Sequence, residues 1–343
     1  MVPASALRSA VALAFKLPPP LLDLAAGRPR PVDGQRLDPA VAAALAARAL
    51  SGAPRLEALS PQEARADYER QALPFRAAPR PVRAVSELEV PGEAGPIPVR
   101  LYTPRRRARP APLAVYYHGG GGVIGGLDSA DNACRFLADE AACLVASVSY
   151  RLAPEHPFPA GLTDAIAAYL AIADMAEGFG AAPARLAVAG DSLGANLATT
   201  VARELAGRAR APKCQLLFYP GVDLTCSYPS HDTFAEGYLL DKPLIDWFRS
   251  HYLSDPALAS DPRASPLFAG SLAGVAPAYV ATAGFDPLRD EGRAYADRLE
   301  QAGALLGYEC FQGLVHGFLS AVDTIDAATR ATREAAAALA ASV

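Results

Sequence analysis

From about residue 84 onward, short β-type runs alternate with helical stretches, and this alternation constrains the fold more than any other feature of the chain. Several of the β-type runs are apolar at consecutive positions, as expected of strands buried on both faces. The pattern predicts an α/β fold with a mostly parallel sheet covered by helices on both faces. The predicted strands are Ala84–Val90, Ile97–Tyr102, Leu113–Tyr117, Leu144–Ser149, Arg185–Ala189, Gln215–Tyr219, Tyr279–Ala283 and Gly307–Phe311. The predicted helices are Asp131–Ala141, Leu162–Met175, Leu193–Leu205, Glu291–Gln301 and Ala327–Ala341.

Two parts of the chain fall outside this alternation. Residues 1–80 carry helix signals and no strand signal: Asp38 and Pro39 form an N-cap pair, and Ser60 with Glu63 has capping-box spacing. Between residues 222 and 277 the alternation gives way to many prolines and one or two short helices. We therefore predict N-terminal cap helices over residues 1–80. The main domain then spans residues 81–343, and its insertion around 222–277 contributes to the cap.

Composition narrows the class of protein. The net charge of −4 and the pI near 5.8 leave no basic surface for nucleic acid. The five cysteines are scattered without a C-x-x-C pair, which predicts a reducing, cytoplasmic setting and gives no zinc-site spacing. The short apolar run Ala10–Phe15 is interrupted by Lys16, which favours an amphipathic cap segment over a signal peptide. No stretch reaches the roughly 18 apolar residues of a membrane span.

The segment Gly190–Gly194 has the form G-x-S-x-G, with Ser192 at its centre. The pattern alone is weak, but a predicted strand precedes it directly and a predicted helix follows it directly. A serine on a sharp strand-to-helix turn has the geometry of a nucleophile elbow. The flanking glycines let the strand and the helix approach closely and permit the strained backbone of the serine. We therefore predict that Ser192 is a catalytic nucleophile. The alternative is a serine in an ordinary glycine-rich turn.

A run of glycines, Gly119, Gly120 and Gly121, follows His118 at the end of another apolar strand. Backbone N–H groups aimed at an attacked carbonyl stabilise the oxyanion, and glycine leaves room for that approach. We predict an oxyanion hole built from these three glycines and the N–H of Leu193, while His118 holds the loop by side-chain hydrogen bonds. A flexible turn is the simpler alternative. A phosphate cradle is disfavoured, because no Walker lysine follows.

A serine nucleophile needs a base and an acid, and in an α/β-hydrolase fold the chain order is serine, then acid, then histidine. His118 and His156 precede the serine, and His231 and His251 lie in the irregular insertion. His316 lies just after the last predicted strand and is the predicted base. The predicted acid is Asp286, at the end of the preceding strand, where the alternative role is a helix N-cap. Asp290 is the second candidate acid.

Five segments together resemble the hormone-sensitive-lipase-like family, also called bacterial family IV esterases. They are His118–Gly121, Tyr150–Ala160, Gly190–Gly194, Asp286–Gly292 and His316–Phe318, and the resemblance runs from about residue 35 to the end. It implies an eight-stranded α/β-hydrolase sheet with a helical cap, hydrolysis of short to medium acyl esters, and no cofactor or metal. Homodimers through the last strand are common in the family. The sequence departs at Leu193, where alanine is usual, and at Gly122, where an aromatic residue is usual.

The predicted function is therefore carboxylic ester hydrolysis by a Ser192–His316–Asp286 triad through an acyl-enzyme, with a small-molecule ester as the partner. Amide hydrolysis or acyl transfer on the same residues is an enzymatic alternative. A non-catalytic ligand receptor on a hydrolase core is the alternative from another class, and it would be expected to lack an intact triad.

Overall fold

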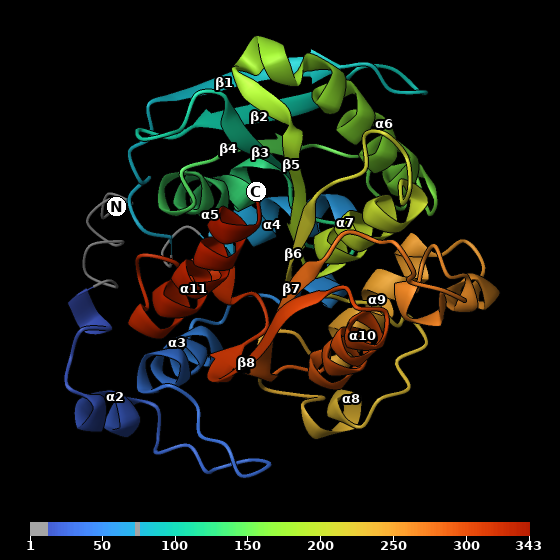
Figure 1. Ribbon diagram of the computed structural model, residues 1–343. Coiled ribbons are helices and arrows are strands. Elements are labelled where there is room, and N and C mark those ends of the chain that lie inside the picture. Colours follow the sequence, from blue (N-terminus) through green and yellow to red (C-terminus); the bar gives the residue numbers. More distant parts are fainter. Residues whose placement is uncertain (1–12, 73–75) are drawn as a thin grey trace.

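The computed structural model describes residues 13–72 and 76–343, and it is built around one eight-stranded sheet in the order β1-β2-β4-β3-β5-β6-β7-β8 (Figure 1). The eight predicted strands are confirmed, and β5 and β8 extend further at both ends than predicted. The bounds are β1 Ala84–Val90, β2 Ile97–Thr103, β3 Ala111–Tyr117, β4 Leu144–Val148, β5 Ala181–Asp191, β6 Cys214–Phe218, β7 Ala278–Phe285 and β8 Leu305–Val315.

The sheet is mostly parallel, as predicted. Strands β4, β3, β5, β6, β7 and β8 pair in parallel, while β2 pairs antiparallel with both β1 and β4. Every residue of β3, β4, β6 and β7 is buried, which explains their consecutive apolar residues. Because parallel strands share one carboxyl edge, the segments that follow β3, β5, β7 and β8 meet at that edge.

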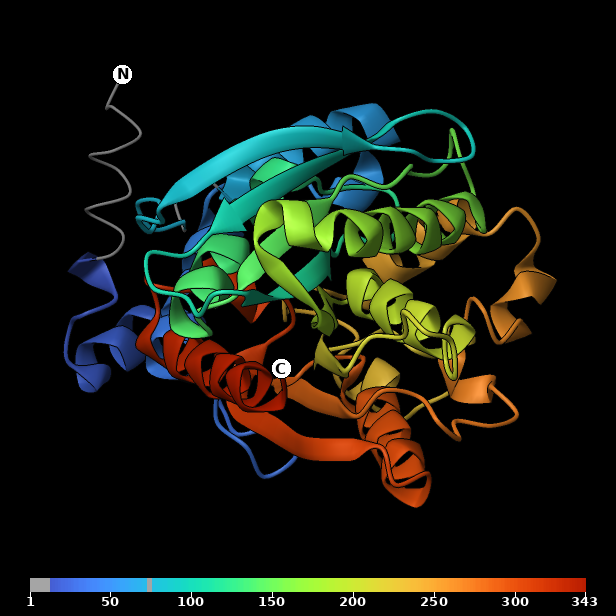
Figure 2. The same cartoon turned by 45° about the horizontal axis from the view of Figure 1, so that its top comes forward.

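Helices cover both faces of the sheet. Helices α5 and α11 pack on one face, and α6, α7 and α10 pack on the other, each group with its own buried core (Figures 1 and 2). Helix α5 begins at Leu127, four residues before its predicted start, because the Ser129 hydroxyl bonds to the backbone of Gly126 and stabilises an additional first turn. The bounds are α5 Leu127–Glu140, α6 Ala160–Met175, α7 Leu193–Glu204, α10 Arg289–Gln301 and α11 Asp326–Ser342.

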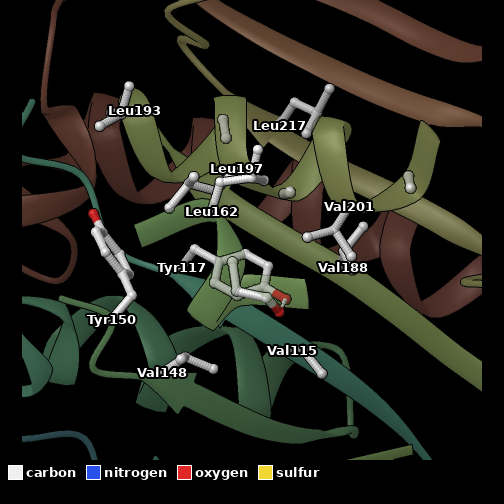
Figure 3. Close-up of a cluster of buried hydrophobic side chains, with 14 of the residues drawn as sticks. Val115, Tyr117, Val148, Tyr150, Leu162, Val188, Leu193, Leu197, Val201 and Leu217 are labelled. Atoms are coloured by element: carbon white, nitrogen blue, oxygen red, sulfur yellow. Dashed lines mark hydrogen bonds between the residues drawn. The ribbon is translucent and has the colours of Figure 1, made fainter. Parts of the chain in front are cut away.

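The core between the sheet and helices α6 and α7 fixes the elements that carry the central turn. Figure 3 shows Tyr117 of β3 and Val188 of β5 beneath Leu197 and Val201 of α7. All four side chains are almost fully buried, and burial of one such side chain stabilises the fold by about 1.5–3 kcal/mol. The Tyr117 hydroxyl donates to the carbonyl of Ala165 in α6, so its one polar group is satisfied.

The segment before β1 contains α2 Pro19–Ala25, α3 Pro39–Leu50, the 3₁₀ turn η1 Leu56–Ala58 and α4 Pro61–Ala72. Both predicted helix starts are confirmed. The Asp38 carboxylate accepts from Ala40 and Val41, and Ser60 and Glu63 exchange side-chain-to-backbone bonds. The first half of the apolar run Ala10–Phe15, residues 10–12, lies outside the described residues. None of the helices in the described part of the chain is long and apolar enough to cross a membrane.

The insertion between β6 and β7 contains α8 Ser230–Thr233, α9 Lys242–Tyr252, and the 3₁₀ turns η3 Pro256–Ser260 and η4 Pro266–Phe268. Helix α9 begins where the Asp241 carboxylate accepts from the N–H of Leu244, followed by proline in the first turn. It packs against η1, so the insertion meets the N-terminal helices at the carboxyl edge of the sheet.

Candidate active site

Ser192 occupies the sharp turn between β5 and α7. Its backbone has φ 56° and ψ −124°, a region that non-glycine residues seldom adopt. A Cβ at Gly190 would lie 2.4 Å from the backbone of Gly194, so the strand and the helix approach too closely for a side chain there. The local sequence thus folds into the elbow because only its glycines permit the turn, and the strained serine lies half-buried at its tip.

The three predicted triad residues lie together in one chain of hydrogen bonds. His316 Nδ1 lies 2.8 Å from Asp286 Oδ2, and His316 Nε2 lies 3.0 Å from Ser192 Oγ. Because a carboxylate only accepts, Nδ1 carries the proton and Nε2 is free to accept from the serine hydroxyl. The ring of Tyr219 packs on the imidazole with centroids 4.7 Å apart and restricts its orientation.

Asp286 directly follows the end of β7 and is completely buried. Its Oδ1 accepts from the N–H of Leu288, and its Oδ2 faces His316, so the carboxylate is fixed at both oxygens. The carboxylate of the alternative acid, Asp290, instead accepts from the N–H of Ser230 and from Arg289 Nε. The structure therefore favours Asp286 over Asp290 as the partner of the histidine.

The other histidines are not brought to the serine. His156 is exposed, and His251 binds the carbonyl of Trp247 within α9. His118 is buried, its Nδ1 donates to the carbonyl of Gly119 at 2.7 Å, and its ring stacks on Tyr150. Burial lowers the pKa of His118 to about 4, so the ring is neutral near pH 7. It holds the glycine loop, as predicted for it.

The structure changes the set of candidate oxyanion donors. The N–H of Gly119 already donates to Asp191 Oδ1 at 2.9 Å. In the described residues, the N–H groups of Gly120, Gly121 and Leu193 donate to no protein acceptor. The N–H of Gly119 is therefore not free for an oxyanion, which differs from the expectation that all three loop glycines are oxyanion donors. The sequence carries no local signal for this contact, because Gly119 and Asp191 are far apart along the chain.

Two of these glycines are required by the close packing of the loop. Gly120 has φ 112°, and a Cβ there would lie 2.2 Å from the carbonyl oxygen of Ile124. Gly121 has φ 61°, and a Cβ there would lie 2.3 Å from the ring of Phe248 in α9. The insertion thus packs against the loop through Phe248, and this contact was not predicted from the sequence.

A cavity of about 260 Å³ opens above Ser192, and most of its wall is apolar. The N-terminal helices supply Val41 and Leu45, and helix α9 supplies Ile245 and Phe248. The segments predicted as a cap therefore form walls of the cavity over Ser192. A cavity of this size and lining fits an apolar group of modest size.

The departures at Leu193 and Gly122 are neighbours in the structure. Gly122 has φ 72°, and a Cβ there would lie 2.7 Å from Leu193 Cδ2 and 2.5 Å from the ring of Tyr252. The space beside Gly122 is thus filled by Leu193 from the elbow and Tyr252 from the insertion. Both side chains also line the cavity.

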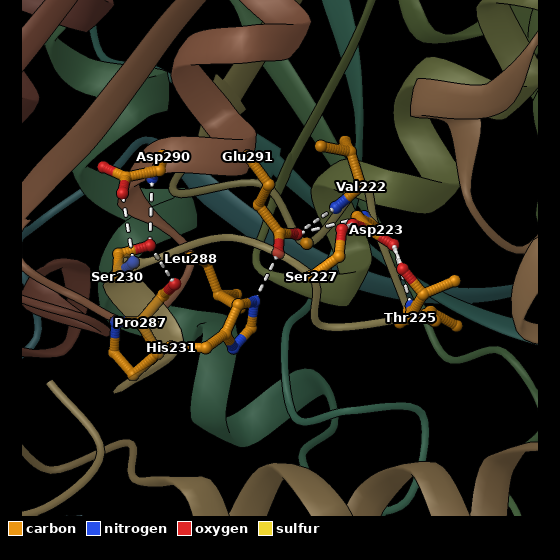
Figure 4. A network of polar contacts seen from close by, with 12 residues as sticks. Val222, Asp223, Thr225, Ser227, Ser230, His231, Pro287, Leu288, Asp290 and Glu291 are labelled. Carbon is orange, nitrogen blue, oxygen red and sulfur yellow. Dashed lines mark hydrogen bonds and ion pairs between the residues drawn. The ribbon is translucent and has the colours of Figure 1, made fainter. Parts of the chain in front are cut away.

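A buried polar network ties the insertion to α10 (Figure 4). The Glu291 carboxylate accepts from the N–H groups of Val222 and Asp223 and lies 2.9 Å from His231 Nε2. Both Glu291 and His231 are buried. The network fixes the start of the insertion to the helix that follows Asp286, and it was not predicted from the sequence.

Comparisons with known proteins agree with this geometry. A family model described as the α/β-hydrolase fold matches residues 114–320. The carboxylic ester hydrolase LipN of Mycobacterium tuberculosis is 42% identical over 304 residues, which are 87% of this chain and 81% of LipN. The ethyl acetate hydrolase of Pseudomonas putida is 39% identical over 77% of this chain and 85% of its own length.

Solved structures give the same result. The hyperthermophilic esterase of the archaeon Pyrobaculum calidifontis superposes with a TM-score of 0.83 at 36% identity, over 89% of this chain and 98% of that one. An ester hydrolase from the Lake Arreo metagenome, complexed with a bipyridine phosphonate derivative, has a TM-score of 0.82 at 43% identity over 86% and 94% of the two chains. The chain belongs to the α/β-hydrolase fold family and to its hormone-sensitive-lipase-like branch, so the predicted fold and resemblance are confirmed.

Proposed function

We propose that the protein is a carboxylic ester hydrolase in which Ser192, His316 and Asp286 act as the catalytic triad. The observation that carries this proposal is the continuous hydrogen-bond chain from Ser192 Oγ through His316 to Asp286 Oδ2. The names of relatives at about 40% identity, which are ester hydrolases, support the same reaction class.

In the acylation step, Ser192 Oγ attacks the ester carbonyl while His316 Nε2 takes the hydroxyl proton. The N–H groups of Gly120, Gly121 and Leu193 stabilise the oxyanion of the tetrahedral intermediate. The buried Asp286 carboxylate holds Nδ1 protonated and stabilises the imidazolium that forms. His316 then protonates the departing alcohol, and the acyl group remains on Ser192.

In the deacylation step, a water molecule takes the place of the alcohol. His316 accepts a proton from that water, and the hydroxyl attacks the acyl carbonyl of the acyl-enzyme. The same N–H groups stabilise the second tetrahedral intermediate. Collapse of the intermediate releases the carboxylic acid and returns the proton to Ser192.

The proposed substrates are small esters with short to medium acyl groups. A cavity of about 260 Å³ is near the lower end of the volumes of small-molecule sites, and its lining is predominantly apolar. Leu193 and Tyr252 fill the space beside the glycine loop, which also favours a compact acyl group. An assembled triad also argues against the receptor alternative, which expects a broken one.

A chain-length panel of p-nitrophenyl esters tests the proposal. We expect hydrolysis of the acetate to hexanoate esters, loss of turnover in Ser192→Ala, and unchanged circular dichroism in that variant. Ser250→Ala is the matched control, because Ser250 is an exposed serine whose hydroxyl bonds to Trp247 and His251 of its own helix, α9. Wild-type turnover in Ser192→Ala would refute the proposal. Faster cleavage of matched amides than of esters would favour the amidase alternative.

A further inference from the structure

Asp191 is a carboxylate beside the nucleophile that the proposed reaction does not use. It is the last residue of β5, and its side chain reaches across to β3 and to the loop that follows it. Oδ1 accepts from the Tyr116 hydroxyl at 2.6 Å and from the N–H of Gly119 at 2.9 Å. Asp191 thus joins the strand that carries Ser192 to the loop that carries the candidate oxyanion donors.

The contact between Asp191 and Gly119 leaves no space for a side chain. A Cβ at Gly119 would lie 2.4 Å from Asp191 Oδ2 and 3.0 Å from the Asp191 carbonyl oxygen. This glycine therefore serves the approach of the loop to the aspartate. That role accounts for its presence in the glycine run although its N–H is not available for the oxyanion.

The Asp191 bond and two neighbouring bonds fix the orientation of successive peptide groups in the loop. In the peptide between His118 and Gly119, the carbonyl accepts from the Tyr150 hydroxyl and the N–H donates to Asp191. In the next peptide, the Gly119 carbonyl accepts from His118 Nδ1. The C=O and N–H of a planar trans peptide point in opposite directions. Fixing the Gly119 carbonyl therefore also fixes the direction of the Gly120 N–H.

We propose that Asp191 is a positioning residue that holds the glycine loop so that the N–H groups of Gly120 and Gly121 face the oxyanion. This inference rests on the proposed function and assigns to Asp191 a role outside the triad. It acts through Gly119, which contacts Asp191 directly, and through Tyr116, which keeps the carboxylate oriented.

Two substitutions distinguish a positioning role of Asp191 from a role of its negative charge. In Asp191→Ala both hydrogen bonds to Oδ1 are lost, so the loop donors are free to move away from the oxyanion. In Asp191→Asn the amide oxygen can accept the same two bonds without a charge. A positioning role therefore predicts rescue by asparagine, whereas a role of the charge itself predicts none.

The experiment measures kcat and KM for p-nitrophenyl butyrate in the full chain. We expect Asp191→Ala to lower kcat by about 10²- to 10³-fold, as for the loss of an oxyanion donor, with KM changed less than about threefold. Asp191→Asn should stay within about tenfold of wild type, and Tyr116→Phe should fall between these two variants. The inhibition constant of a trifluoromethyl ketone, which forms a tetrahedral adduct with an oxyanion, should rise in parallel with the loss of kcat/KM in each variant.

Asp164→Asn is the matched control, because Asp164 is another buried carboxylate and binds Arg151 in a different part of the fold. It should lower the melting temperature without changing kcat. The proposal is overturned if Asp191→Ala lowers kcat less than threefold, or if Asp191→Asn is as defective as Asp191→Ala. If Asp191→Ala does not fold, the inhibition constants of Asp191→Asn and Tyr116→Phe test the proposal. The inhibition constant should rise more in Tyr116→Phe than in Asp191→Asn, and the reverse order would overturn the proposal. Inactivity of the wild-type chain would instead count against the proposed function.

Discussion

The Cα of Gly194 faces the carbonyl of Tyr117 so closely that a Cβ would lie 2.0 Å from the Tyr117 oxygen. Gly194 is in the first turn of α7, and Tyr117 is the last residue of β3, directly before the glycine loop. The turn that carries Ser192 and the glycine loop are therefore held against one another by direct backbone contact, and a larger residue at position 194 would push them apart.

Gly194→Ala should consequently disturb both stability and activity. A methyl group cannot fit at 2.0 Å from a backbone oxygen, so α7 or β3 must shift. We expect a loss of about 3 kcal/mol in the free energy of unfolding and at least a tenfold loss in kcat/KM. Urea unfolding and ester hydrolysis measure the two effects. Gly178 is exposed, and a Cβ there would have no neighbour within 4 Å, so Gly178→Ala should change neither stability nor activity. Equal effects in both variants would contradict this account.

Asp286→Asn should impair catalysis with little effect on substrate binding. The asparagine amide can donate to His316 Nδ1, which leaves the proton on Nε2 and removes the acceptor for Ser192. We expect kcat to fall by about 10³- to 10⁴-fold and KM to change less than about threefold. Asp290→Asn, at the alternative acid, is the control and should keep most of the activity. The reverse ranking of the two variants would show that Asp290 is the acid.

His118 should make the stability of the protein depend on pH in the acid range. Burial lowers its pKa from 6.5 to about 4, so the unfolded chain binds a proton that the folded chain does not bind in this interval. The free energy of unfolding should therefore fall as pH drops from 6.5 towards 4, by up to about 3 kcal/mol from this residue.

Urea unfolding at several pH values from 7.5 to 4.5 tests this dependence. In His118→Asn the amide can still donate to the Gly119 carbonyl, and the decrease of stability towards acid pH should be smaller than in wild type. His156→Asn, at an exposed histidine, should keep the wild-type decrease. An identical pH dependence in wild type and His118→Asn would disprove the assignment.

Leu193→Ala should extend the range of acyl groups. The Leu193 side chain lines the cavity and fills the space next to Gly122, so its removal opens room beside the oxyanion donors. We expect the ratio of kcat/KM for longer over shorter p-nitrophenyl esters to rise about fourfold for each methylene newly accommodated. Leu197→Ala removes an equally large buried side chain one turn along α7 and should lower stability without changing this ratio. A ratio that is the same in both variants would refute the role of Leu193.

The features that could be predicted from the sequence are those encoded in short segments. The strand–helix alternation predicts the sheet, and residues at the ends of β5, β7 and β8 predict Ser192, Asp286 and His316 as neighbours, because parallel strands end at one edge. The capping residues Asp38 and Ser60 mark helix starts for the same local reason.

The remaining features depend on contacts between segments that are distant in the chain. Asp191 accepts a hydrogen bond from the N–H of Gly119 only after β3 and β5 pair, and no local pattern indicates that bond. Phe248 reaches Gly121 only because the insertion folds back over the loop, and Glu291 meets His231 in the same way. Irregular segments rich in proline carry no periodicity from which such packing follows.

Covalent labelling with a fluorophosphonate tests the central claim, that Ser192 is the nucleophile, most directly. The reagent phosphonylates a serine activated by a neighbouring base, and peptide mass spectrometry locates the adduct. We expect a single adduct on the peptide that contains Ser192, loss of ester hydrolysis in proportion to labelling, and no adduct in Ser192→Ala. An adduct on another residue that abolishes activity, or full activity in the labelled protein, would contradict the account.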